Sequence, residues 1–268
     1  MRANLKTLTV VLLVLFAGAV ALAQEELKPE TKITARVFAD FTTKDVKDDA
    51  SGYKSDATGV GPDVKRFYIG IATKFNSTWS ATFLTDIGDQ SSSKYDVYVK
   101  NAYIQYTNSP AFNIRVGAST GPWESWEDPV GLQNTRYLDA PPTDRLGFAN
   151  SADWGLFFLG KSGMVSYNVA VLNGKGYSIT TRSKTVDFEG ILTVQPVKEF
   201  QFSLGGYSGK RGYETENFGA VNTATRPNVG AKAQFGGLGV FGEYWTAKNW
   251  NNVVPTSATV AVKDDKSD

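Results

Sequence analysis

After its N-terminal apolar stretch, the chain is a series of short segments in which apolar and polar residues alternate, joined by connections that are in turn short and long. In the segment 31–42, Ile33 and Val37 share one parity with other apolar residues, whereas Arg36 and Asp40 share the other. A period of two with one apolar face is typical of a β-strand that is buried on one side. The sequence therefore predicts an all-β protein.

About eleven segments follow this pattern, and most are close to the 9–11 residues that cross a bilayer when a strand is tilted. They are 31–42, 64–75, 78–87, 95–106, 112–118, 154–160, 164–173, 186–195, 200–208, 228–235 and 239–246. In 95–106 the apolar parity changes between Val99 and Ala102. A β-bulge near Lys100 and Asn101 would restore a single apolar face.

The lengths of the connections alternate along the whole chain. Short turns lie at 76–77, 108–110, 161–163, 196–199 and 236–238, and longer polar connections lie at 43–63, 89–94, 119–153, 174–185 and 209–227. Outer-membrane barrels have short periplasmic turns and longer outside loops. We therefore predict a transmembrane antiparallel up-and-down β-barrel.

A soluble β-sandwich is the main alternative fold, because it also has alternating strands and tight turns. It buries its apolar face between two sheets and leaves its polar face in water. Strand length, loop asymmetry and aromatic residues near strand ends, which would form interfacial girdles, favour the membrane barrel. These aromatic residues are Phe41, Phe75, Trp79, Tyr106, Phe112, Trp154 and Phe235.

Residues 1–23 have the features of a cleavable secretory signal peptide. Arg2 and Lys6 precede an apolar stretch from Leu8 to Leu22, and a small-residue cleavage site follows at once. That stretch is short for a spanning helix, and no later apolar run reaches the ~20 residues that such a helix requires. The sequence therefore predicts export, with residues 24–268 forming one barrel domain.

Composition excludes several classes of function. The chain has no His and no Cys, which removes disulfides, thiolate or imidazole metal sites, and Ser-His or Cys-His catalysis. Removing Arg2 and Lys6 from the 28 basic residues leaves 26 against 27 acidic ones, a net charge of −1. No overall basic field argues for nucleic acid. We expect no cofactor, no metal and no enzymatic activity.

The longest connection, 119–153, is too long to be a simple surface link. Around it the chain resembles the outer-membrane porins, and most closely the phosphate-selective porin O and P family. The residues that carry the resemblance are Ala102–Tyr106, Ile114–Gly117, Val169–Gly176, Glu189–Pro196 and Val240–Tyr244. The resemblance implies a homotrimer of barrels of about sixteen strands in the outer membrane of a Gram-negative bacterium. It also implies a water-filled channel for small hydrophilic or anionic solutes, narrowed where the third outside loop, 119–153, folds inward.

Two sets of charged residues are candidates for controlling passage. The loop would supply a constriction formed by Glu124, Glu127, Asp128, Arg136, Asp139, Asp144 and Arg145. The interior of a wide barrel faces water, so basic wall residues keep their charge at membrane depth. The wall candidates are Arg36, Arg66, Lys74 and Arg115. Basic wall residues would favour anions, and the loop carboxylates would oppose them.

Two features differ from what the resemblance implies. The nearly neutral mature chain does not show the strong basic excess expected of a phosphate-selective pore. Barrels of this family also end on a strand with a terminal aromatic residue, whereas this chain ends AVKDDKSD. An open edge in lipid leaves unpaired backbone groups that cost several kcal/mol each. We therefore expect an incomplete barrel of about 11–12 strands, truncated at the C-terminus, with closure by fewer strands as the alternative.

A different class of function also fits one tract. Residues 123–128, Trp-Glu-Ser-Trp-Glu-Asp, combine indoles with carboxylates. Indoles stack on sugar faces, and a pair of carboxyls can flank a glycosidic bond. The alternative prediction is thus a secreted or periplasmic β-sandwich that binds carbohydrate or hydrolyses glycosides.

Overall fold

The computed structural model describes residues 29–45, 59–89, 95–127, 141–213, 222–250, 253 and 266–267. The predicted leader, 1–23, lies outside them. The described residues form one antiparallel sheet of 13 strands, with two short helices. The strands are β1 (Glu30–Lys44), β2 (Gly59–Lys74), β3 (Trp79–Asp89), β4 (Tyr95–Ser109), β5 (Phe112–Thr120), β6 (Ala152–Ser162), β7 (Val165–Leu172), β8 (Asp187–Val197), β9 (Phe200–Gly209), β10 (Ala224–Phe235), β11 (Leu238–Trp245), β12 (Ala247–Lys248) and β13 (Lys266–Ser267), and the helices are α2 (Pro122–Glu127) and α3 (Pro142–Arg145).

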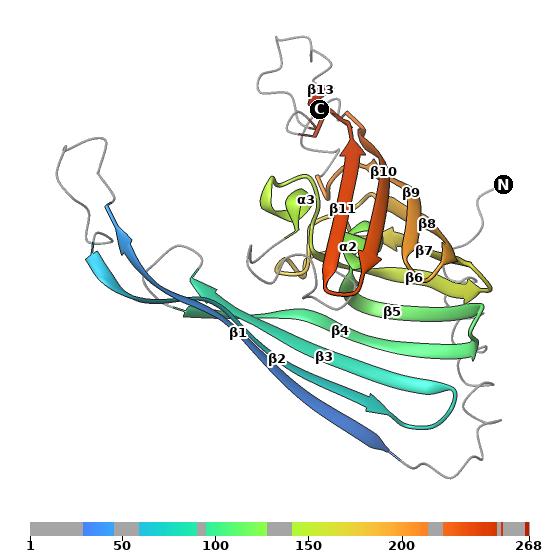
Figure 1. Cartoon of the computed structure of the whole chain (residues 1–268), viewed down its shortest axis with the longest axis horizontal. Coiled ribbons are helices and arrows are strands. Elements are labelled where there is room, and N and C mark those ends of the chain that lie inside the picture. The colour runs from blue at the N-terminus through green and yellow to red at the C-terminus, as the bar shows by residue number, and fades with distance from the viewer. Residues whose placement is uncertain are drawn as a thin grey trace.

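The sheet is an up-and-down meander in which each strand from β2 to β11 pairs with the strand before it. The predicted fold class is confirmed, and each of the eleven predicted segments forms a strand. Beyond the end of β11, β12 pairs with β10 at Thr225, and β13 pairs with β12. Within the described residues β1 pairs only with β2 and β11 only with β10, so the sheet is curved but not closed (Figure 1).

The short turns join β2 to β3, β4 to β5, β6 to β7, β8 to β9 and β10 to β11, and the long connections join the remaining pairs. Because the strands are antiparallel, the short turns all lie at one end of the sheet. Gly163 and Gly236 both have a φ of 57° in two of these turns, a backbone conformation that glycine adopts without strain. The predicted alternation of turns and loops is therefore present in the fold.

The predicted bulge in β4 is confirmed. Leu84 of β3 pairs with Asn101, and the next residue, Thr85, pairs with Val99, so Lys100 has no opposite partner in the ladder. An extra residue on one strand turns consecutive side chains toward the same side. As a result both Lys100 and Asn101 line the concave side of the sheet.

The apolar rows of the long strands β1–β11 face away from the concave side. Ile33, Leu204 and Val240 are 72%, 61% and 60% exposed, respectively. The concave face instead buries polar side chains such as Asn168 of β7 and Arg226 of β10. A β-sandwich would pack its apolar rows together between two sheets, so the alternative fold prediction is wrong. An apolar outer face is what a barrel presents to hydrocarbon.

Aromatic side chains pair across neighbouring strands at the short-turn end. The Trp79 and Tyr106 ring centroids are 5.1 Å apart, and those of Phe200 and Phe235 are 5.4 Å apart. Their position matches the aromatic belt of membrane barrels. Trp154, at the opposite end, differs because its Nε1 donates a 3.1 Å hydrogen bond to the carbonyl of a loop residue, Tyr177.

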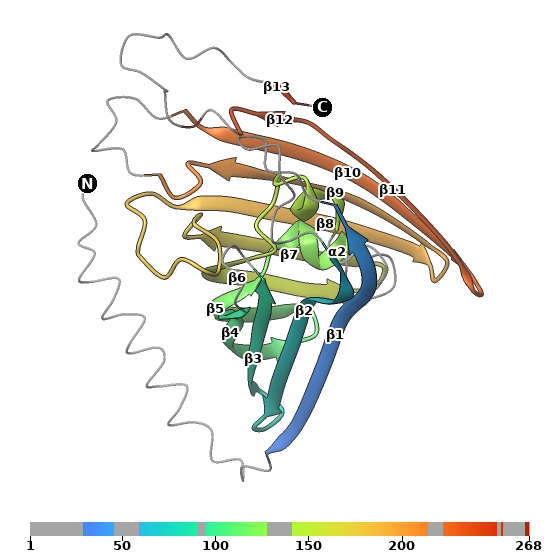
Figure 2. The same ribbon diagram turned by 90° about the vertical axis from the view of Figure 1, so that its left-hand side faces the viewer.

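The 119–153 connection contributes both helices. In Figure 2 they lie on the concave side, between the half of the sheet formed by β1–β5 and the half formed by β7–β11. Both are short, and no helix in the described part of the chain is long and apolar enough to cross a membrane. The core of the molecule is therefore formed by a loop inside the curved sheet.

Candidate functional site inside the curved sheet

The two indoles of α2 fix the loop to the second half of the sheet. Trp123 and Trp126 have ring centroids 4.9 Å apart and pack against Ile191 of β8 and Phe241 of β11. Trp123 is fully buried, and Trp126 is nearly so. Burying one indole removes about 150–250 Å² from water, which is worth about 4–6 kcal/mol before entropic costs. Apolar burial is thus the main force that holds α2 in place.

Two glycines provide the space for these rings. A Cβ atom on Gly205 of β9 would lie 2.8 Å from Cε3 of Trp123, and one on Gly230 of β10 would lie 2.2 Å from Cη2 of Trp126. Carbon atoms in contact are normally about 3.5–4.0 Å apart. A larger residue at Gly230 would therefore displace the Trp126 indole, and one at Gly205 would press on both the Trp123 indole and the carbonyl oxygen of Gly190, which lies 2.6 Å from the added Cβ.

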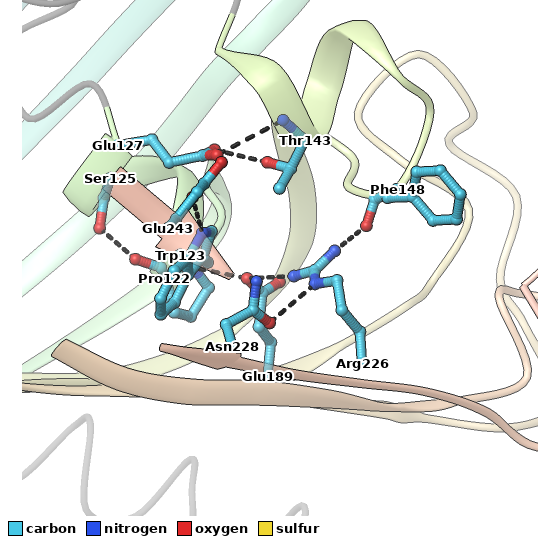
Figure 3. A network of polar contacts seen from close by, with 10 residues as sticks. All are labelled: Pro122, Trp123, Ser125, Glu127, Thr143, Phe148, Glu189, Arg226, Asn228 and Glu243. Atoms are coloured by element: carbon cyan, nitrogen blue, oxygen red, sulfur yellow. Dashed lines mark hydrogen bonds and ion pairs between the residues drawn. The ribbon is translucent and has the colours of Figure 1, made fainter. Parts of the chain in front are cut away.

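Polar contacts orient α2 where it packs against the second half of the sheet (Figure 3). The backbone N–H of Trp123 donates to Oε1 of Glu189 at 2.9 Å, and its Nε1 donates to Oε2 of Glu243 at 3.0 Å. At the other end of the helix, Nζ of Lys232 donates to the carbonyls of Trp126 and Glu127. A cation near the last carbonyls of a helix is favourable.

A buried ion pair holds the returning half of the loop. Arg226 of β10 and Glu189 of β8 are 3.2 Å apart between Nη2 and Oε1, and both are almost fully buried. Arg226 also donates to Oδ1 of Asn228 at 3.0 Å and to the carbonyl of Phe148, after α3. Glu189 therefore links α2, through Trp123, to the segment that follows α3.

A carboxyl pair lies where the two helices meet β11. Oε2 of Glu127 accepts a 2.5 Å hydrogen bond from Oγ1 of Thr143 in α3, and the same carboxyl hydrogen-bonds Glu243. Burial raises the pKa of Glu127 to about 10, with further contributions from its hydrogen bond to Glu243 and from the charges of Glu124 and Glu243. Glu127 is therefore protonated at neutral pH, since neighbouring carboxylates in a dry site cannot both ionise.

A cavity of about 490 Å³, which we name the charged cavity, lies between the loop and the first half of the sheet. Its lining includes four cations from four different strands and two loop carboxylates. They are Arg36 of β1, Arg66 of β2, Lys100 of β4 and Arg115 of β5, with Glu124 of α2 and Asp144 of α3. Opposite charges across a confined aqueous gap create a field that orients passing solutes.

Aromatic and amide groups hold these cations in position. Cζ of Arg115 lies 4.1 Å from the ring centroid of Tyr103, and its Nε and Nη2 donate to Oε1 of Gln105 at 3.2 and 2.9 Å. Nζ of Lys100 lies 5.3 Å from the ring centroid of Tyr68. Cation–π contacts of this kind contribute about 0.5–1 kcal/mol each at exposed sites and more when desolvated.

A second connection, 173–186, also reaches the first half of the sheet. The hydroxyl of Tyr177 donates a 2.8 Å hydrogen bond to Oδ2 of Asp86 in β3, and its ring centroid is 5.7 Å from Nζ of Lys100. Burial and the nearby charge of Asp86 raise the pKa of Tyr177. Lys100 therefore contacts the tyrosine rings of both Tyr177 and Tyr68.

The structure brings most of the predicted site residues together. The charged cavity is lined by Glu124, Asp144, Arg36, Arg66 and Arg115, and Glu127 is buried beside it. Arg145 is exposed on α3. Lys74 is exposed at the short-turn end, where it lines a separate depression with Trp79. Asp128, Arg136 and Asp139 lie outside the described residues.

Several site residues were not singled out from the sequence. They are Lys100, Tyr177, Glu189, Arg226, Lys232 and Glu243. The four in β8, β10 and β11 are charged residues at inward positions of strands whose outward positions are apolar, which is a signal that the sequence contains. No group of three acidic side chains in the described part of the chain is placed to hold a metal ion.

Comparison with known proteins supports the fold. No protein-family model and no curated protein sequence matches the chain. One matching solved structure is the loop L8 deletion mutant of OmpT, an outer membrane protein of Vibrio cholerae. The match has a TM-score of 0.50 and 10% sequence identity, and it covers 84% of this chain and 70% of that chain. At this identity the likeness concerns the fold alone, which is that of an outer-membrane β-barrel.

Proposed function

We propose that the chain forms a water-filled channel in the outer membrane, through which ions and small hydrophilic solutes diffuse passively. The observation that carries the proposal is a charged loop held inside a sheet whose outer face is apolar. Charges at membrane depth persist only where water or protein solvates them. Four cations on the concave face, opposite the loop carboxylates, fit the wall and constriction of such a channel.

The loop supplies the constriction in this proposal. Apolar contacts with β8–β11 hold α2 in place. The charged cavity remains between the loop and β1–β5 and forms the path for solutes. Glu124 and Asp144 face the path from the loop, and Arg36 and Arg115 face it from the wall. The homotrimer and the likeness to phosphate-selective porins stay predictions.

The geometry of residues 123–128 gives less support to the alternative function, a protein that binds carbohydrate or hydrolyses glycosides. Both indoles of 123–128 pack against the sheet, so neither ring face is free to stack on a sugar. Glu127 is engaged by Thr143 and Glu243, whereas glycosidases need two carboxyls flanking an accessible bond. We therefore propose that the protein is a channel and not an enzyme.

Single-channel recording tests the proposal. Purified protein that has folded in detergent should produce discrete current steps when it is added to a planar lipid bilayer in potassium chloride. Folded protein that inserts into vesicles but gives no steps would refute the channel. Release of reducing sugar from oligosaccharides by the same preparation would instead support the glycosidase.

A further inference from the structure

A second cavity, of about 440 Å³, lies on the side of the loop toward the short turns. Ser125, Leu159 and Asn168 line this cavity and the charged cavity alike, so the two adjoin at α2. We name it the neutral cavity, because Lys161 is the one charged residue among the described residues that line it. A solute that passes α2 meets both cavities in turn.

Amides and hydroxyls supply most of the polar groups in the wall of the neutral cavity, beside apolar side chains such as Leu159 and Met164. The polar side chains include Asn113, Asn168, Gln195, Gln201, Ser166 and Thr193. Amides present both donors and acceptors, and each hydroxyl acts as either. A body that carries several hydroxyl groups can replace its hydration shell with contacts of this kind, whereas an apolar or purely ionic body cannot.

Two buried polar atoms at this cavity lack a hydrogen-bond partner within the described part of the chain. They are Oδ1 of Asn168, an acceptor, and Nε1 of Trp126, a donor. Their side chains belong to residues that are only 8% and 6% exposed. A buried polar atom without a partner costs about 1–3 kcal/mol. Both atoms are enclosed, so a solute hydroxyl, which both donates and accepts, reaches them only when their side chains turn toward the cavity.

The charged cavity favours an acid group. Among the described residues, four cations and two carboxylates line it, and the nearby Asp86 is already 4.0 Å from Arg66 and hydrogen-bonded to Tyr177. Lys100 contacts two ring faces and, among the described residues, no carboxylate. Its three N–H groups are thus available to an anion in the path.

We propose that the channel selects small polyols that carry one acid group, such as sugar acids or sugar phosphates. This inference rests on the proposed channel function. The acid group pairs with Lys100, and the hydroxylated body occupies the neutral cavity. An inorganic anion lacks the hydroxylated carbon body that would fill the neutral cavity, and a neutral sugar lacks the charge that would pair with Lys100.

Block of the chloride current tests this selectivity in planar bilayers. Gluconate and glucose 6-phosphate should each halve the conductance at concentrations about tenfold lower than acetate, inorganic phosphate or glucose, since one charge-assisted or buried hydrogen bond corresponds to about a factor of ten. The stronger of the two blockers identifies the preferred acid group. Equal block by acetate or phosphate, or by glucose, would overturn the inference while leaving the channel intact. Absence of current steps would instead remove the proposed function and the inference with it.

Variants separate the two cavities. Lys100→Gln should raise the half-blocking concentration of gluconate toward that of glucose, and Gln201→Leu should raise it toward that of acetate. Lys74→Gln is the matched control, because Lys74 is exposed and lines neither cavity. Each variant must retain the chloride steps, which shows that it folds. Unchanged gluconate block in both test variants would contradict the assignment.

Discussion

Replacing Gly230 by alanine should shift α2 away from β10 and toward the path of solutes. The added Cβ would lie 2.2 Å from Cη2 of Trp126, so the ring must move by about 1.3 Å to reach a normal contact. Overpacking of this kind costs about 1–3 kcal/mol, less than the about 4–6 kcal/mol that burial of one indole supplies. The helix should therefore shift and stay docked, because its polar anchors at Glu189 and Glu243 remain in place.

The expected result is a smaller conductance. A sphere of the charged cavity's 490 Å³ is about 10 Å across, so a shift of about 1.3 Å along one diameter removes about an eighth of its cross-section. Single-channel conductance in potassium chloride should fall by a similar fraction. Gly242→Ala in β11 is the control, because a Cβ there meets nothing within 4 Å. An unchanged conductance would show that α2 does not border the path, and a larger one would show that it detaches.

Three further predictions concern pH, stability and orientation. The folded protein holds the Glu127 proton up to about pH 10, whereas an unfolded chain releases it near pH 4.5, so loop docking should be strongest at low pH and weaken as the pH rises. Single-channel recordings should show that current noise increases from pH 6 to pH 10. The Glu127→Gln variant, which cannot lose this proton, should show no such increase. Arg226→Met should lower the free energy of unfolding by about 3–5 kcal/mol, because it leaves the Glu189 carboxylate buried without its ion-pair partner. Adding Glu189→Leu should restore part of this loss. Thermal unfolding of the two variants in detergent measures both effects. Val169→Arg, on the outer face of β7, should impair folding into vesicles by about 2–4 kcal/mol near the bilayer midplane, whereas Ser166→Arg on the concave face should cost less, and equal costs would contradict the assigned faces.

Alternation of residue type predicted the strands because it is a local property of the chain. The bulge in β4 was predictable for the same reason: apolar parity changes between Val99 and Ala102, and one extra residue restores it. The direction of the apolar rows was not fixed by any single strand, because a sandwich and a barrel share the pattern. Loop asymmetry supplied the missing information, and the exposed outer face confirmed the barrel-like fold.

The contacts of the site were less accessible from the sequence. Trp123 and Glu243 are 120 residues apart, and Asp86 and Tyr177 are 91 apart. Such pairs depend on how the sheet curves, which no local pattern encodes. Gly230 shows the same limit, since a glycine in a strand signals a close approach without identifying the ring that makes it.

The two halves of the sheet have different roles at the site. The residues that hold the loop belong to β8–β11, where glycines receive the indoles and Glu189, Arg226 and Glu243 supply the polar anchors. The cations of the charged cavity come instead from β1, β2, β4 and β5. Position of the constriction and charge of the wall can therefore vary independently. Substitutions that shift the loop on β8–β11, such as Gly230→Ala, should change the conductance for all small ions alike, whereas substitutions of wall cations such as Arg36 should change the ratio of anion to cation permeability. Reversal potentials in a salt gradient distinguish these outcomes, and a shift in selectivity caused by Gly230→Ala alone would contradict this separation.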